Sequence, residues 1–117
     1  MKYLKDLTPE IALDESIELW VFLAKTGGPK LGWAGWNEWR GHPRHYCFFC
    51  HLRNSSSPRC QQKDCPLWDS EKDECCWGRG QPYNKWVNSI TLTTRRYYAA
   101  LVLAQLMEAK NENNNKM

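Results

Sequence analysis

The segment from Thr8 to Pro29 reads TPEIALDESIELWVFLAKTGGP and carries the start, the apolar face and the stop of one helix. The Thr8 hydroxyl can cap the helix, and Pro9 suits the first helical position, where its missing N–H costs nothing. Apolar residues then recur at spacings of four and three on one face: Leu13, Ile17, Trp20 and Ala24. Either glycine of the following pair can adopt a left-handed conformation, and Pro29 prevents continuation. We therefore predict a helix over residues 9–26.

A second helical region lies at the other end of the chain. A short helix is predicted to begin at Pro82, since proline favours the first helical turn. A long helix is predicted over residues 94–110, capped by Thr93 or Thr94, because its apolar residues cover nearly all sides of two turns. Residues 111–117 are polar and aperiodic, so we expect a disordered tail there.

Length and composition indicate one small folded domain, which we place at residues 1–110. The chain has 117 residues, and its seven tryptophans, five tyrosines and three phenylalanines are too many bulky apolar groups for a disordered protein. No apolar stretch approaches the length of a membrane span, and residues 1–10 lack the apolar run of a secretory signal. We therefore expect a cytoplasmic protein with no membrane partner, in which thiols stay reduced.

All six cysteines lie within residues 28–80, a segment without sustained periodicity. Cys47 and Cys50 form a CxxC pair, and Cys60 and Cys65 form a second, more widely spaced pair. Two such pairs are typical of a tetrahedral zinc site, because Zn²⁺ binds four soft thiolate ligands. We predict a structural Zn²⁺ bound by these four cysteines.

Other residues of the segment could complete the same site. A competing set replaces Cys60 with one member of a vicinal pair, and a histidine could also substitute for a cysteine; the alternates are Cys75, Cys76, His45 and His51. The sequence CFFCH also matches a c-type haem attachment motif, but haem attachment needs export and would leave four cysteines without a role. A redox CxxC pair would be expected near a βαβ pattern, which this sequence lacks.

The stretch GWAGWNEWR places three tryptophans at intervals of three: Trp33, Trp36 and Trp39. With Arg40 and Arg44 nearby, these rings could form an exposed surface that binds a partner or stacks on nucleic acid bases. Alternatively, they pack in the core, because a thin core depends on large aromatic side chains. The spacing favours burial, since in a short helix it puts the rings along one face.

The cysteine pattern and its surroundings resemble small uncharacterised cysteine-rich proteins of bacterial viruses. The shared features are Cys47-x₂-Cys50, Cys60, Cys65-Pro66-Leu67, Cys75-Cys76 and Pro82-Tyr83-x₂-Trp86, followed by an alanine-rich helix. This resemblance implies a protein of the bacterial host cytoplasm that binds and modulates a host protein or a defence system.

Together these features predict a mainly α-helical single domain, in which an irregular zinc-stapled segment joins two principal helices. We expect a non-enzymatic binding protein, a phage-encoded inhibitor or modulator of a host protein, since no acid–base or nucleophile motif and no small-molecule substrate is indicated. The alternative is a zinc-dependent nucleic-acid-binding module that contacts phosphates through Lys30, Arg40, Arg44, Arg53 and Arg59. Zinc binding to four thiolates would lower the formal charge from +3 to about +1, which weakens this alternative.

Overall fold

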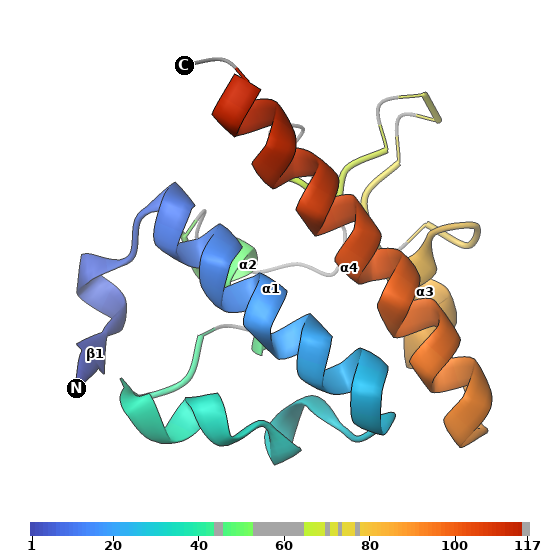
Figure 1. Cartoon of the computed structure of the whole chain (residues 1–117), viewed down its shortest axis with the longest axis horizontal. Helices are drawn as coiled ribbons and strands as arrows, with labels where there is room; N and C mark the ends of the chain where they lie inside the picture. The colour runs from blue at the N-terminus through green and yellow to red at the C-terminus, as the bar shows by residue number, and fades with distance from the viewer. Residues whose placement is uncertain (44–45, 53–64, 70, 73, 77, 116–117) are drawn as a thin grey trace.

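Helices form most of the secondary structure in the computed structural model of the chain (Figure 1). The structure describes residues 1–43, 46–52, 65–69, 71–72, 74–76 and 78–115. In chain order the elements are β1 (Lys2–Tyr3), the 3₁₀ helix η1 (Leu4–Asp6), α1 (Pro9–Thr26), the 3₁₀ helices η2 (Lys30–Gly32) and η3 (Ala34–Glu38), β2 (Trp39–Arg40), α2 (Phe48–Leu52), α3 (Pro82–Val87) and α4 (Leu92–Asn115). The prediction of a mainly helical domain built on two long helices is confirmed, whereas the zinc staple stays a prediction.

The two long helices, α1 and α4, pack side by side and run antiparallel (Figure 1). Near the start of α1, the Lys110 ammonium reaches Asp14 at 3.0 Å, and near its end the carbonyl of Ala24 accepts a hydrogen bond from Arg96 Nε at 3.4 Å. The apolar residues that are fully buried in the described part of the chain come from both long helices and from α2: Ala12, Leu19, Leu23, Phe48, Ala99, Val102 and Leu106. Burial of these side chains, rather than intrinsic helix propensity, holds the helices in place.

The boundaries of α1 are those predicted. Thr8 Oγ1 accepts a hydrogen bond from the Ile11 N–H at 3.2 Å, and Pro9 follows as the first helical residue. At the other end, Gly27 adopts φ +68° and its N–H donates to the Leu23 carbonyl at 2.8 Å. The start of α3 at Pro82 is confirmed as well.

The long helix α4 begins two residues earlier than predicted. Its cap is Thr91, whose Oγ1 accepts a hydrogen bond from the Thr94 N–H at 3.1 Å, and not Thr93 or Thr94. The sequence TLTT offers three threonines in four positions, and the hydrogen bond from the Thr94 N–H identifies the first of them as the cap. Local sequence alone therefore left the cap unresolved.

Helix α4 also continues beyond its predicted end. We expected residues 111–117 to form a disordered tail, but the helix runs through Asn115. Asparagine is a weak helix former, yet it costs only a few tenths of a kcal/mol per residue, and no glycine or proline interrupts this stretch. The last two residues lie outside the described part of the chain.

Short elements occupy the first part of the segment that joins the long helices, namely η2, η3, β2 and α2, whereas the described residues from 65 to 81 belong to no named helix or strand. Strand β1 pairs in parallel with β2, and the register joins Lys2 to Trp39 and Tyr3 to Arg40. Helix α2 packs against α1. None of the helices in the described ranges combines the length and the apolarity that crossing a bilayer requires.

Candidate functional site

Helix α2 places the CxxC pair beside the core. Phe48 and Phe49, the two residues between the cysteines, are buried, and they fix the helix against its neighbours. Cys47 directly precedes the helix and Cys50 lies within it, so a spacing of three brings both sulfur atoms to one side. The Cys50 N–H donates to Cys47 Sγ at 3.5 Å. Both thiols therefore point to a shared position.

The two thiols titrate as a pair. A hydrogen bond from the Cys50 side chain lowers the pKa of Cys47 to about 6 despite burial, and the ammonium of Lys30 contributes to this lowering. The same hydrogen bond raises the pKa of Cys50, and burial and negative charge at Cys47, Cys76 and Cys65 raise it further. Of these two thiols, Cys47 is therefore the first to ionise as the pH rises. Cys50 lies within electrostatic range of three other sulfur atoms.

A cage of aromatic rings surrounds the Lys30 ammonium. Lys30 Nζ donates to Tyr83 Oη at 2.6 Å and lies 4.6 Å from the centre of the same ring. It also lies 5.8 Å from the Trp86 ring and 5.9 Å from the Trp20 ring. Distances of this size are typical of cation–π contacts, which strengthen when water is excluded.

The caged ammonium also faces the cysteines. Burial lowers the pKa of Lys30, and the nearby sulfur atoms of Cys47, Cys50 and Cys76 act in the opposite direction, favouring its charged form. One positive charge therefore lies among sulfur atoms that come from distant parts of the sequence. The charge can offset thiolates formed at this position.

The predicted zinc ligands are only partly described. The five cysteines within the described ranges are free thiols: Cys47, Cys50, Cys65, Cys75 and Cys76. Cys60 and the alternate His45 lie outside those ranges. Within them, no group of three or more histidine, cysteine, aspartate or glutamate side chains has an arrangement that could hold a metal ion. The ligand set therefore stays a prediction.

The structure separates the alternate ligands from one another. Cys76, and not its neighbour Cys75, contributes to the charge felt by Cys50 and by Lys30. The remaining alternate, His51, has a buried Nδ1 atom without a hydrogen-bond partner in the part of the chain that is described. Its backbone N–H donates to the Cys47 carbonyl at 3.1 Å, so the ring belongs to the same region.

The three tryptophans of the candidate partner surface are buried in this structure. Trp33, Trp36 and Trp39 are 9%, 7% and 6% exposed. Their ring centres lie 6.4, 5.4 and 5.2 Å from that of Phe48, so they enclose the first residue of α2. Such rings have no free face for stacking on a nucleic acid base. Of the two arginines expected beside them, the first is exposed and the second lies outside the described residues: Arg40 and Arg44.

The sequence did not reveal that Lys30 contacts aromatic rings; it placed Lys30 among the residues expected to contact phosphates. Its partner Tyr83 is 53 positions away, and no local pattern links the two. The only available signal was the PYxxW motif, whose spacing puts Tyr83 and Trp86 on one side of a helix.

No protein-family model, curated protein or solved structure matches this chain. The chemistry of the site is therefore inferred from its own residues. They are the cysteine thiols, the Lys30 ammonium and the aromatic rings that surround this ammonium.

Proposed function

We propose that this chain is a non-enzymatic binding protein whose middle segment is held in place by one structural zinc ion. The proposed ligands are Cys47, Cys50, Cys65 and Cys76, which do not form a ready metal site in the described part of the chain, so zinc binding must draw their sulfur atoms together. The observation that carries this proposal is the CxxC pair, in which the Cys50 N–H lies 3.5 Å from Cys47 Sγ; negative charge at Cys76 and Cys65 also raises the pKa of the Cys50 thiol. In this set Cys76 takes the place of Cys60, whose sequence spacing from Cys65 is wide for a ligand pair.

The chemistry of the surroundings supports zinc. Four thiolates bound to Zn²⁺ carry a net charge of −2, and the caged ammonium of Lys30 lies close enough to three of these sulfur atoms to stabilise that charge. Structural zinc binding supplies about 10–16 kcal/mol of apparent free energy in small peptides. A chain of 117 residues with a thin core would benefit from such a contribution.

The same coordination favours binding over catalysis. Four protein ligands leave no open position on the metal for water or substrate, whereas catalytic zinc keeps one. The resemblance to cysteine-rich proteins of bacterial viruses favours a host protein, such as a defence protein, as the partner. In that case the chain acts as an inhibitor or modulator.

The vicinal cysteines provide a matched test. We expect Cys76→Ser to lose most of its bound zinc, because it removes one of the four ligands, whereas Cys75→Ser should retain about one zinc per chain. Elemental analysis of protein purified without chelators measures the zinc content. Thermal unfolding followed by circular dichroism should show a lower Tm for Cys76→Ser than for Cys75→Ser.

Two results would contradict the proposal. The first is wild-type protein without zinc, whether it contains iron or intramolecular disulfides in its place. The second is equal zinc content in both variants, which would exclude Cys76 as a ligand. A separate measurement decides the class of partner. If the protein binds oligonucleotides at low salt and the affinity falls steeply as the salt concentration increases, the partner is nucleic acid and not a protein.

A further inference from the structure

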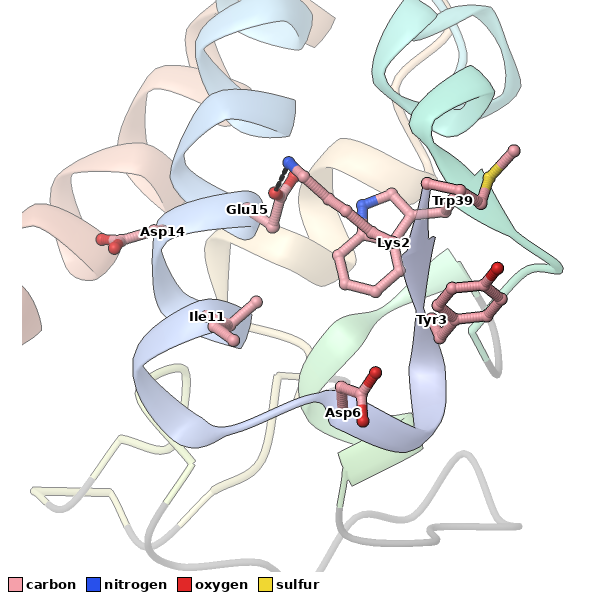
Figure 2. A pocket seen from close by; sticks show the side chains of 8 residues that line it. Lys2, Tyr3, Asp6, Ile11, Asp14, Glu15 and Trp39 are labelled. Carbon is pink, nitrogen blue, oxygen red and sulfur yellow. Dashed lines mark hydrogen bonds and ion pairs between the residues drawn. The ribbon is translucent and has the colours of Figure 1, made fainter.

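A cavity of about 320 Å³ lies beside the two short strands, and it is unrelated to the cysteines (Figure 2). This volume is at the lower end of the range for small-ligand sites. Residues from β1, η1, α1 and β2 line it together with the first residue: Met1, Lys2, Tyr3, Asp6, Ile11, Asp14, Glu15 and Trp39. The pairing of β1 with β2 places Lys2 beside Trp39 at this cavity.

Two buried polar atoms of residues that line this cavity have no hydrogen-bond partner among the described residues. Glu15 is 7% exposed; its Oε1 accepts a hydrogen bond from Lys2 Nζ, whereas its Oε2 accepts none from the described residues (Figure 2). Trp39 is 6% exposed, and its Nε1 donates to no acceptor in the same part of the chain. A buried polar atom without a partner costs about 1–3 kcal/mol, and more when it is charged. One acceptor and one donor beside the cavity therefore lack a partner among the described residues, and a ligand that displaces Lys2 could reach them.

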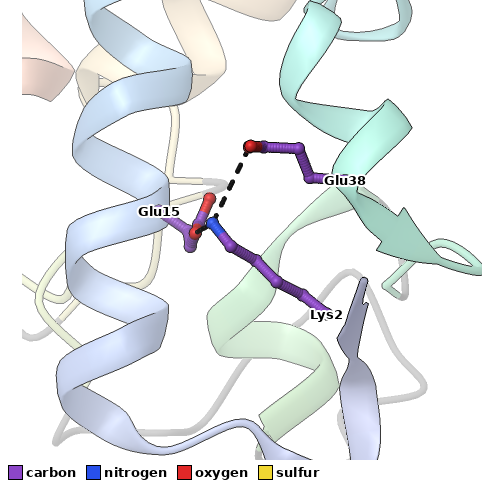
Figure 3. Close-up of polar contacts among 3 residues, drawn as sticks. All are labelled: Lys2, Glu15 and Glu38. Carbon is purple, nitrogen blue, oxygen red and sulfur yellow. Dashed lines mark hydrogen bonds and ion pairs between the residues drawn. The ribbon is translucent and has the colours of Figure 1, made fainter.

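The unpartnered oxygen of the buried Glu15 carboxylate favours a cationic donor. The cavity is lined by the carboxylates of Asp6, Asp14 and Glu15 and by the amines of Lys2 and Met1, and the Asp14 carboxylate also pairs with Lys110 at 3.0 Å. The Lys2 ammonium is shared, because Glu38 Oε2 also lies 3.7 Å from it (Figure 3). Lys2 is 44% exposed at its side chain, so it can move into solvent once another cation takes its place at the buried Glu15 carboxylate.

The walls favour a cation that is flat and partly apolar. Tyr3 is 42% exposed and Ile11 38% exposed at the cavity, and the Lys2 ammonium already lies 5.9 Å from the centre of the Trp39 ring. Guanidinium groups are planar and weakly hydrated, they contact aromatic rings, and they form strong hydrogen bonds to carboxylates.

We propose that this cavity binds an arginine residue of a peptide. The guanidinium donates to Glu15 Oε2 and displaces the Lys2 ammonium, and a backbone carbonyl of the peptide accepts from Trp39 Nε1. This site is independent of the proposed zinc ion, so either proposal can fail without the other.

Two small peptides that differ only in charge test the proposal. N-acetyl-arginine amide is titrated into the full chain by isothermal calorimetry, alongside N-acetyl-citrulline amide, which has nearly the same shape and the same backbone carbonyls but a neutral urea group in place of the guanidinium. We expect the citrulline peptide to bind at least about tenfold more weakly, because a charge-assisted hydrogen bond to a buried carboxylate is lost.

Two substitutions should move the arginine affinity in opposite directions. Glu15→Gln should weaken it by about tenfold or more, and Lys2→Met should strengthen it several-fold by removing the competing ammonium. Glu71→Gln, an exposed carboxylate that does not line the cavity, is the control of equal charge change. Tryptophan fluorescence verifies that each variant is folded.

The proposal is overturned if both peptides bind equally, if neither binds at millimolar concentration, or if Lys2→Met weakens arginine binding. An arginine affinity that folded Glu15→Gln leaves unchanged would overturn it as well. If Glu15→Gln does not fold, the Lys2→Met variant and the citrulline comparison still decide.

Discussion

Gly27 ends α1, and its lack of a side chain lets α4 approach closely at that point. Its φ of +68° lies in the left-handed region, and a Cβ there would come 2.5 Å from Leu92 Cδ1 and 3.1 Å from Arg96 Cγ. The side chain of Leu92 is exposed and can move, so the backbone strain is the larger penalty. A non-glycine residue in this conformation costs about 1–2 kcal/mol.

We therefore expect Gly27→Ala to lower the free energy of unfolding by about 1–2 kcal/mol in urea denaturation. Gly32→Ala is the matched control, because a Cβ there would meet Phe22 Cζ at 3.7 Å, an ordinary contact, and its φ is not in the left-handed region. Equal stability of the two variants would show that the Gly27 conformation carries no strain.

At the scale of elements, the start of α4 is set by a single hydroxyl. Thr91 Oγ1 accepts from the Thr94 N–H at 3.1 Å and lies 2.7 Å from Thr94 Oγ1, whereas the exposed Thr93 lies one position inside the helix start. We expect Thr91→Ala to lower the free energy of unfolding by about 1 kcal/mol and Thr93→Ala to lower it by less. Thermal unfolding of both variants measures the difference. A larger loss of stability for Thr93→Ala would indicate that Thr93, one of the two predicted caps, and not Thr91 caps the helix.

The short helix α2 has two roles. Its buried residues Phe48 and Phe49 form part of the aromatic core. Cys50 in the helix and Cys47 just before it interact electrostatically with Lys30, and Cys50 also with cysteines from later in the chain. A helix of this length is not stable alone, so tertiary contacts or a bound metal must hold it.

At the scale of the whole molecule, the contact between α1 and α4 is the main stabilising interface. Leu106 is fully buried, whereas its neighbour Met107 is 42% exposed. We expect Leu106→Ala to lower the free energy of unfolding by about 2–5 kcal/mol, because it leaves a cavity in a close-packed core. Met107→Ala should cost under about 1 kcal/mol. Urea denaturation measures both, and similar losses would mean that α4 packs with a different face.

The sequence by itself determined the elements whose limits are encoded locally. The start and stop of α1 follow from Thr8, Pro9 and Gly27, because capping hydroxyls, an initial proline and a left-handed glycine act within one turn of chain. The start of α3 follows from Pro82 for the same reason.

Only the tertiary structure decided how distant residues meet. The cage around Lys30, the grouping of Cys50 with Cys76 rather than Cys75, and the cavity at Glu15 join positions that are far apart along the chain. Hydrophobic burial draws such segments together but acts on area and not on residue identity, so periodicity and spacing do not predict their partners. The spacing of the three tryptophans favoured their burial, which the structure confirms, but only the tertiary structure placed them around Phe48.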